Sequence, residues 1–495
     1  MPSIRRTKTS SGSTAVQAVE YRKRKLVMLK HFGSARTEAE LEALIQDAEQ
    51  WITEQTGQTS LFTPSQKERV LHLGVTRFLG VRYQLGYVLL RDMLHRLGFT
   101  VLGKGLLLDL AVMRIFEPSS KRRAIELLER YFGISYAERT LYRMLPKCSA
   151  HKDAAEKIAV SFAKQHLNDQ LSFVLYDVTT LYFESFEPDE LRKPGFSKDN
   201  KANQPQIVVG LLVNPDGFPL GYEIFKGNAF EGHTMLPVIN IFRKAHGVAT
   251  CTIVADAAMM SLANLQELKE HNLSYIVGAW VANLSPAVIT GAAASLNQDD
   301  QKTVRISTEH GDLICAFSAL RFRKDRAEME KQIKKAETLI AADGGRRAKF
   351  VTTAESRYEL NTALIDKTKK LLGIKGYYTN IPLADAPDRA IIVHYGNLWR
   401  IEQSFRMTKS DLVARPIFHR KENAIKAHML ICFIALAAGK YLELMTGVSL
   451  RRIIDLLKRV PDARMFNTRT HKEILLRAEM PEELRLLLKK LNLSY

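Results

Sequence analysis

Cysteine is scarce in this chain of 495 residues, and its spacing excludes two ways of stabilising a small fold. The four cysteines, Cys148, Cys251, Cys315 and Cys432, are far apart and form no Cys-x-x-Cys pair. Neither a zinc ribbon nor a disulfide framework is therefore indicated. The thiols fit the reducing environment of a cytoplasm.

Long apolar runs are missing as well. The longest, Met429 to Gly439, is too short to cross a bilayer. Residues 1–20 are basic and rich in Ser and Thr, but they lack the apolar stretch of a secretory signal. We therefore expect a soluble, cytoplasmic protein with no membrane partner.

Acidic residues are outnumbered by basic ones. The chain has 72 Lys and Arg against 53 Asp and Glu, a formal net charge of +19, and part of the excess is clustered at 22–25 and 121–123. Such an excess favours a polyanionic partner, nucleic acid more than membrane, although a solvated basic surface gives the same count. With 46% hydrophobic and 25% charged residues the composition is globular, and roughly 150 residues per domain predicts about three units.

The first 60 residues predict a small α+β module. Apolar residues alternate over 14–19, and a second short apolar run follows at 26–29, which is typical of a hairpin. Thr37 and Glu40 then have the spacing of a capping box, followed by apolar residues at helical period.

Residues 61–150 predict an all-helical DNA-binding region. From Gln66 to Leu145 there is helical periodicity and no strand signal. A basic helix, a turn at Gly133 and a second helix bearing Arg139 and Arg143 give the outline of a helix-turn-helix. An ordinary helical pair with exposed arginines fits this pattern equally well.

Strand-type segments begin at Leu171 and predict an α/β domain with a mixed sheet. They occupy 171–176, 179–186, 206–213, 218–225, 251–255, 275–277 and 376–380. Helical stretches alternate with the later ones. A weak β segment and a strongly charged helical stretch interrupt the pattern, which predicts an insertion domain at 280–374 between core parts 165–279 and 375–440. A helical region, 441–495, is expected to close the chain.

Three carboxylates stand out against this pattern. Asp177 and Asp256 each follow an apolar strand segment, where a crevice normally opens and a metal can be reached, although Asp there also forms turns and caps. Glu402 lies in a predicted helix whose spacing puts it on one face with Tyr395 and Lys409. A carboxylate in such a stripe requires a coordinated ion or a structural ion pair.

The chain resembles the insertion-sequence DDE transposases that carry a Tyr-x2-Arg-x3-Glu-x6-Lys signature. Tyr395, Glu402 and Lys409 match this frame, whereas Leu398 stands at the arginine position. The runs Tyr-Asp-Val-Thr-Thr around Asp177 and Ile-Val-Ala-Asp around position 256 look like the family's first two acidic motifs. The resemblance implies an RNase H-like core, a mixed five-stranded sheet with an insertion domain.

The resemblance also implies the chemistry and the partners. Asp177, Asp256 and Glu402 would hold two Mg²⁺ or Mn²⁺ ions for cleavage and joining of double-stranded DNA, with Asp177 bridging. Lys409 and Tyr395 would contact phosphates. The DNA would comprise terminal inverted repeats and a target, bound by a homodimer on the nucleoid of a prokaryotic cell.

Three further residues have two interpretations each. Arg400 and Arg406 would contact DNA phosphates or form surface ion pairs. Trp280, at the start of the insertion, would stack on an extruded base or pack in the core.

Two other functions fit the same residues. One is an RNase H-like nuclease or Holliday-junction resolvase, and the other is a regulator that binds ends without cutting.

Overall fold

The computed structural model describes residues 2–10, 12–22, 25–56, 75–103, 105–167, 169–184, 187–196, 203–259, 261–341, 348–354, 357–468 and 471–493. Its internal contacts divide the chain into two units. The smaller comprises Met1–Gly80 with Ala463–Leu476, and the larger comprises Val81–Asp462 with Arg477–Tyr495. Part of the basic cluster 22–25 and the start of the predicted helical block at Gln66 lie outside the described residues. The six-part division made from the sequence stays a prediction.

The smaller unit opens with a three-stranded antiparallel sheet and a helix. Strands β1 (Ser3–Lys8), β2 (Thr14–Arg22) and β3 (Lys25–Ala35) pair in that order, and α1 (Glu38–Thr56) packs on them. The capping box is confirmed, because the N–H of Glu40 donates to Thr37 Oγ1 at 3.3 Å. The predicted hairpin is β2 and β3. The sequence did not predict β1, whose basic residues are mostly exposed and show little apolar alternation.

A second sheet corrects two expectations about this chain. Strand β4 (Thr76–Arg82) pairs with β15 (Asp462–Asn467), which pairs with β16 (Lys472–Arg477). The regions 61–150 and 441–495 are therefore not all-helical. The partners of β4 are almost 400 residues away along the chain, so local periodicity could not reveal the pairing.

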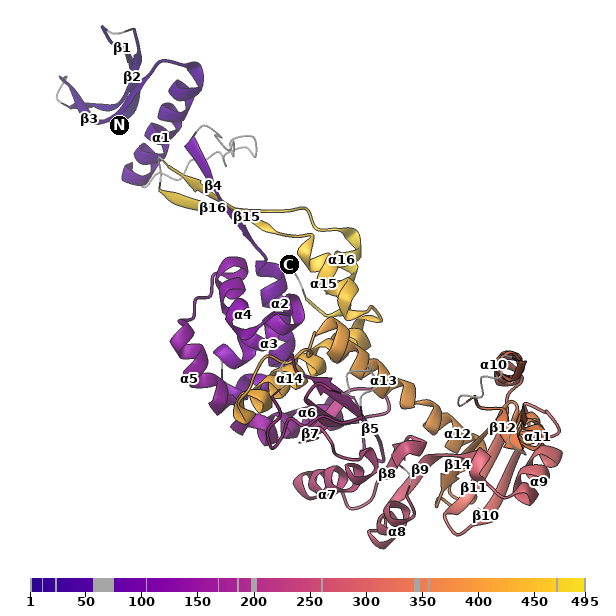
Figure 1. The fold of residues 1–495 in the computed structure, drawn as a ribbon. Coiled ribbons are helices and arrows are strands. Elements are labelled where there is room, and N and C mark those ends of the chain that lie inside the picture. Colours follow the sequence, from indigo (N-terminus) through magenta and orange to yellow (C-terminus); the bar gives the residue numbers. More distant parts are fainter. Residues whose placement is uncertain are drawn as a thin grey trace. The chain divides into compact units, whose positions relative to one another are not determined.

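The helical part of the larger unit surrounds one apolar helix, α14 (Glu422–Thr446). Around it lie α2 (Gln84–Arg96), α3 (Leu106–Phe116), α4 (Lys121–Leu127), α5 (Glu138–Cys148), α6 (Lys152–His166), α15 (Leu450–Lys458) and α16 (Glu482–Lys490) (Figure 1). By length and composition α14 could cross a membrane. However, 83% of its most apolar window is buried inside the fold, which accounts for its composition.

An eight-stranded mixed sheet forms the other part of the larger unit. Its order is β10-β11-β14-β9-β8-β5-β6-β7. The strands are β5 (Phe173–Tyr182), β6 (Gln206–Val213), β7 (Pro219–Lys226), β8 (Thr252–Ala255), β9 (Ser274–Ala279), β10 (Thr303–Thr308), β11 (Gly311–Phe317) and β14 (Ile374–Thr379). Strand β8 is parallel to both β5 and β9, and the other pairs are antiparallel.

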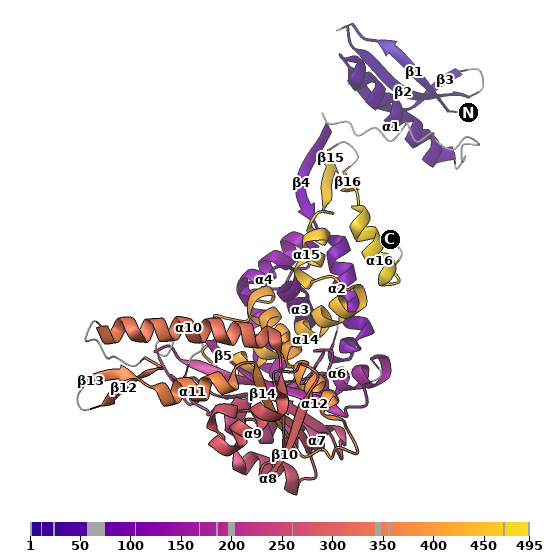
Figure 2. The same ribbon diagram turned by 90° about the vertical axis from the view of Figure 1, so that its right-hand side faces the viewer.

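The predicted five-stranded sheet is thus extended by three strands. Strands β10 and β11 fall inside the predicted insertion, yet β11 pairs with β14 and continues the sheet. The rest of the insertion comprises α9 (Pro286–Leu296), α10 (Ala319–Ala341), the hairpin β12 (Val351–Ala354) and β13 (Arg357–Leu360), and α11 (Thr362–Leu371). Figure 2 shows α10 lying along this hairpin and α11, with which it shares a small apolar cluster.

The remaining helices of this part are α7 (Met235–His246), α8 (Leu262–Glu270), α12 (Asp388–Gly396) and α13 (Leu398–Arg406), followed by a π-helical turn, η9 (Met407–Asp411). The sequence predicts one long helix from about Arg389 through Lys409. The structure instead has two helices that meet at Asn397 and a π-turn that carries Lys409.

Close packing between β5 and β6 gives a first test of this fold. A Cβ atom added to Gly210 would lie 2.5 Å from Tyr176 Oη, and the tyrosine is fully buried with its hydroxyl donating to Thr234. We expect Gly210→Ala to lower the free energy of unfolding by about 1–3 kcal/mol, because overpacking forces the ring or strand to move. Urea unfolding followed by circular dichroism measures this change.

Gly291→Ala on α9 is the matched control, because no atom lies within 4 Å of its added Cβ. Helix propensity predicts that this change is neutral or stabilising by up to about 1 kcal/mol. Equal losses of stability in the two variants would contradict the packing of β5 against β6.

Candidate active site

The register of two parallel strands brings two aspartates together. Tyr176 of β5 pairs with Ala255 of β8, so Asp177 and Asp256 are the next residues along neighbouring strands. Asp256 directly follows β8, as predicted. Asp177, however, lies in the middle of β5 and not at its end. Strand β5 continues because β6 pairs with it up to Tyr182, whereas β8 stops and leaves the other edge of β5 open at Asp177.

Both aspartates lie on the face of the sheet that α12 and α13 cover. Alternate residues of a strand share a face, so Asp177 lies on the same side as Phe173. The ring of Phe173 stacks on His394 of α12 at 3.9 Å between centroids. The hydroxyl of Tyr395, also on α12, donates to Asp256 Oδ1 at 3.0 Å. Asp177 is half-buried and Asp256 is exposed.

Tyr395 joins the helix to the aspartate and is itself held by aromatic and cationic neighbours. It is buried, its ring meets Tyr377 edge-on at 4.8 Å, and Lys375 Nζ lies 4.4 Å from its centroid. Burial raises the pKa of Tyr395, and the negative charge of Asp256 raises it further. The phenol therefore stays protonated and keeps its hydrogen bond to the carboxylate.

Lys375, at the start of β14, is a residue that the sequence did not single out. Burial lowers its pKa, and Arg321 lowers it further, whereas the nearby charges of Asp256 and Glu402 oppose that shift. The charges of two of the three acids thus act on the pKa of one lysine. Its signal in the sequence is weak: it alternates with Tyr377 and Thr379, which puts it on their face of the strand.

Glu402 lies on α13, which packs against β5, and its carboxylate is exposed. The predicted stripe on one helical face is only partly present, because Tyr395, Leu398 and Phe405 are buried while Glu402 is not. The charges of Asp256 and Glu402 both affect the pKa of Lys375 and the pKa of Tyr395, so these two acids lie in one region of the site.

The chemistry of this donor set fits a hard divalent cation. Three carboxylates offer only oxygen ligands, which Mg²⁺ and Mn²⁺ prefer over nitrogen or sulfur. Among the described residues, however, no group of three His, Cys, Asp or Glu is gathered closely enough to hold one ion. Asp177, Asp256 and Glu402 are therefore not gathered closely enough in this structure to share one ion.

Trp280 lies beside the aspartates and not in the core. Its side chain is 56% exposed, and its indole N–H donates to the carbonyl of Ala257, the residue after Asp256, at 3.2 Å. The core-packing interpretation is wrong, because more than half of Trp280, which directly follows β9, is exposed. The base-stacking interpretation stays a prediction.

The predicted DNA-contacting cations have different surroundings. The guanidinium of Arg400 lies 5.0 Å from the centroid of Trp399, and Arg406 is exposed. Lys409 is half-buried in the π-turn. Arg139 and Arg143 are exposed on α5, which follows a left-handed residue at Gly133 (φ +74°). The helix-turn-helix stays a prediction.

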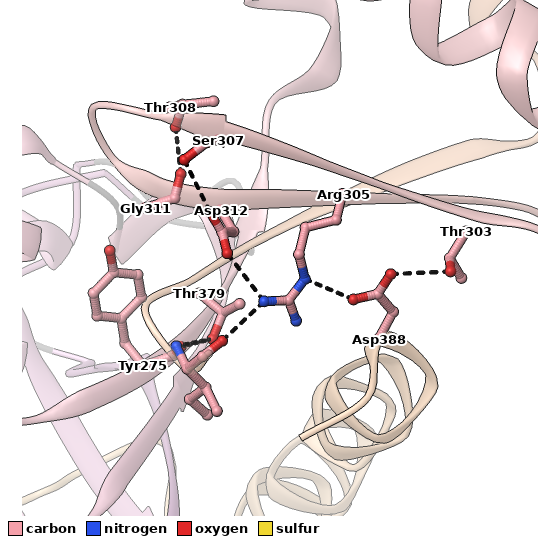
Figure 3. Close-up of polar contacts among 10 residues, drawn as sticks. Tyr275, Thr303, Arg305, Ser307, Thr308, Gly311, Asp312, Thr379 and Asp388 are labelled. Carbon is pink, nitrogen blue, oxygen red and sulfur yellow. Dashed lines mark hydrogen bonds and ion pairs between the residues drawn. The ribbon is translucent and has the colours of Figure 1, made fainter. Parts of the chain in front are cut away.

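Arg305 of β10 links the added strands to the first residue of α12 (Figure 3). Its Nε donates to Asp388 Oδ1 at 2.7 Å, and its Nη1 donates to Asp312 Oδ2 and to the carbonyl of Ile381, each at 3.0 Å. Thr303 donates to the second oxygen of Asp388 at 3.0 Å. The helix that carries Tyr395 is thus anchored at its start by a largely buried ion pair.

We expect Arg305→Gln to lower the free energy of unfolding by about 3 kcal/mol or more, because it leaves a largely buried carboxylate without its cation. Thermal and urea unfolding of the full chain measure the loss. Arg326→Gln is the control: Arg326 pairs with Glu330 on the exposed face of α10 at 2.8 Å, and loss of such a pair costs about 0.5 kcal/mol or less. A similar, small effect of both changes would contradict the anchoring role.

Comparison with known proteins gives one family match. The sequence model of the family described as "Transposase DDE domain" matches residues 169–438, more than half of the chain. This stretch contains β5 to α13 with all three acids. No curated protein matches the chain. Among solved structures, a piggyBac transposase synaptic complex with hairpin DNA aligns with a TM-score of 0.35 and 9% identity, over 76% of this chain and 79% of that chain.

Proposed function

Because the chain belongs to the transposase DDE domain family, we propose that it is an insertion-sequence transposase that cuts the ends of its element and joins them to target DNA. The observation that carries the proposal is the parallel register that puts Asp177 beside Asp256, under the helices that bear Tyr395 and Glu402. The matched segment begins just before the first acid and ends after the third.

The order of the strands supports an RNase H-like core. Five neighbouring strands run β7-β6-β5-β8-β9: three antiparallel strands connected in sequence, followed by two strands parallel to the first of them. The acids lie on the central strand, after its parallel neighbour and on a helix that covers the same face. Strands β14, β11 and β10 extend this core on the β9 side.

Asp177, Asp256 and Glu402 are the residues that would hold two Mg²⁺ or Mn²⁺ ions. When bound, such a pair of ions activates an oxygen nucleophile and stabilises the leaving oxygen in an in-line substitution at phosphorus. The open arrangement of Glu402 fits a site that closes on metal and DNA together.

The chain's own cations and hydrogen bonds prepare this site. Tyr395 orients the carboxylate of Asp256 by donating to Oδ1. Lys375 would bring positive charge near Asp256 and Glu402, whose charges both affect its pKa. Lys409, Arg400 and Arg406, which lie on α13 and η9, would contact phosphates of the DNA, and Arg139 and Arg143 would contact DNA from α5. A homodimer would bring two element ends together.

The proposal is tested with a labelled duplex of the element end, with Mg²⁺ or Mn²⁺ and with EDTA. We expect metal-dependent nicking and joining by wild type, and a loss of about 10³-fold or more in Glu402→Gln with end binding retained, because several kcal/mol of charge stabilisation are removed. Glu422→Gln is the control, since this exposed glutamate only pairs with Lys426.

Two outcomes would overturn the proposal. Binding without cutting under both metals would assign the chain to a regulator of element ends. Cutting without joining would assign it to a nuclease or a junction resolvase.

Trp280 is proposed to stack on a base extruded next to the cleavage point. Its exposed indole is anchored beside Asp256, and stacking would contribute about 1–3 kcal/mol per base. With 2-aminopurine at the terminal position, we expect a fluorescence increase on binding that Trp280→Ala loses and Trp280→Phe retains. An unchanged signal in Trp280→Ala would show that the indole has no such role.

A further inference from the structure

A cavity of about 110 Å³ lies between the helical region and the segment that follows η9, away from the three acids. Its lining combines two buried cations with two histidines: Arg114 of α3, Lys121 of α4, His419, and His428 of α14. The other lining residues are Ser119, Ser120, Val413, Pro416 and Phe418. None of these described lining residues is acidic, so four groups able to carry positive charge face the cavity without a carboxylate.

Lys121 has an unusual partner for a buried lysine. It is 5% exposed, and its Nζ lies 2.9 Å from His428 Nδ1. The other nitrogen of that ring, Nε2, lies 2.9 Å from the carbonyl of Ala414, which can only accept. Nε2 therefore carries the hydrogen, and Nδ1 accepts from the lysine. Burial and the charge of Arg114 hold the pKa of Lys121 well below its usual range.

Arg114 is also incompletely satisfied. It is 5% exposed, its Nη1 donates to the carbonyls of Leu412 and Val413, and its Nη2 donates to the carbonyl of Ser119. Its Nε is buried and has no hydrogen-bond partner. A guanidinium that meets only carbonyl dipoles and an unsatisfied N–H is costly in the interior, unless an anion completes it.

Lys440 shows what a buried lysine looks like elsewhere in the same fold. It lies on the same helix as His428 and is 2% exposed, but its Nζ donates to Glu443 at 3.2 Å and to Gln403 at 3.3 Å. That lysine has its counter-ion within the chain. Lys121 and Arg114 have no carboxylate among the described residues that line their cavity, so an anion from solution would supply the counter-ion that they lack.

We propose that this cavity is a binding site for a single phosphate group. Donors line it on α3 (Arg114), on α4 (Lys121) and on the segment that carries His419, which suits an oxyanion with acceptor oxygens in several directions. Its lining includes the exposed residues Ser120, Val413 and Phe418, so a ligand can enter from solvent, and the neighbouring Arg420 and Lys421 are exposed as well. This entrance would admit a free phosphate or one phosphate of a nucleic-acid backbone, and only the second source rests on the proposed function.

A bound phosphate would place negative charge beside Lys121, which otherwise faces the positive charge of Arg114. A dianion favours the protonated form of Lys121, so binding takes up a proton and weakens as pH rises above the pKa of the empty site. The other titratable groups that face Lys121 are Arg114, His419, His428 and Cys432. Burial and the two nearby cations lower the pKa of His419 to about 4, so it is neutral near pH 7 and donates only as an imidazole.

Two buried-lysine substitutions give a matched test with opposite expectations. Lys121→Met removes a cation that has no carboxylate partner, so we expect the full chain to fold with little loss of Tm. Lys440→Met leaves Glu443 without its partner, so we expect a lower Tm. Sodium phosphate, compared with sodium chloride at equal ionic strength, should raise the Tm of wild type and of Lys440→Met but not of Lys121→Met.

Titration calorimetry measures the affinity for phosphate and the number of protons taken up on binding. In two buffers of different ionisation enthalpy, wild type should take up protons as inorganic phosphate binds at pH 8, where the phosphate in solution is already mostly dianion and releases few protons of its own. His419→Gln, a half-buried change at the same cavity, should weaken phosphate by about tenfold. No phosphate-specific Tm shift and no binding heat in wild type would overturn the site, whatever the variants do.

A duplex without element sequence distinguishes the two sources. If a backbone phosphate occupies the cavity, inorganic phosphate competes with the duplex, and Lys121→Met lowers the slope of log affinity against log salt by about one. If a free anion occupies it, phosphate binds without displacing the duplex. Because neither arm needs cleavage, an inactive enzyme at the three acids leaves this test intact.

Discussion

The parallel pairing of β5 with β8 is the constraint on which the site depends. Both strands are buried in the middle of the sheet, with helices over their faces, so their pairing cannot slide without turning apolar side chains toward the wrong layer. A shift of one residue would also move Asp177 to the opposite face from Asp256. The packing that stabilises the core therefore also fixes the positions of Asp177 and Asp256 relative to each other.

The third acid is positioned by a different kind of contact. It lies on α13, which Ser404 holds to the sheet. The contacts of Arg305 with Asp388 and of Tyr395 with Asp256 hold the preceding helix, α12. The hydroxyl of Ser404 donates to the carbonyl of Gly217 at 2.8 Å, in the turn between β6 and β7. The break at Asn397 separates the two contacts of α12 from Glu402. Glu402 is thus anchored less directly than the aspartates, in keeping with its exposure.

The basic residues of the chain lie in two kinds of surroundings, exposed and buried. Most Lys and Arg side chains that the structure describes are not fully buried, and such exposed charges interact only weakly and in a salt-dependent way. A smaller part is buried, and there the surroundings decide the consequence. Lys440 is neutralised within the chain by Glu443, whereas Arg114 and Lys121 share one cavity without a carboxylate. Only the second arrangement creates a demand for an external anion.

The sequence by itself determined many of the local elements, and it predicted the three acids. Alternation predicted β2, a short apolar run predicted β3, and the Thr37–Glu40 spacing predicted the start of α1. Apolar runs predicted most strands of the large sheet, because these signals depend on neighbours within one element. Only the tertiary structure decided the rest. The pairing of β4 with β15, the joining of β10 and β11 to β14, the role of Lys375 and the buried basic cavity all depend on contacts between distant segments. Such contacts are set by packing and leave no period in the sequence.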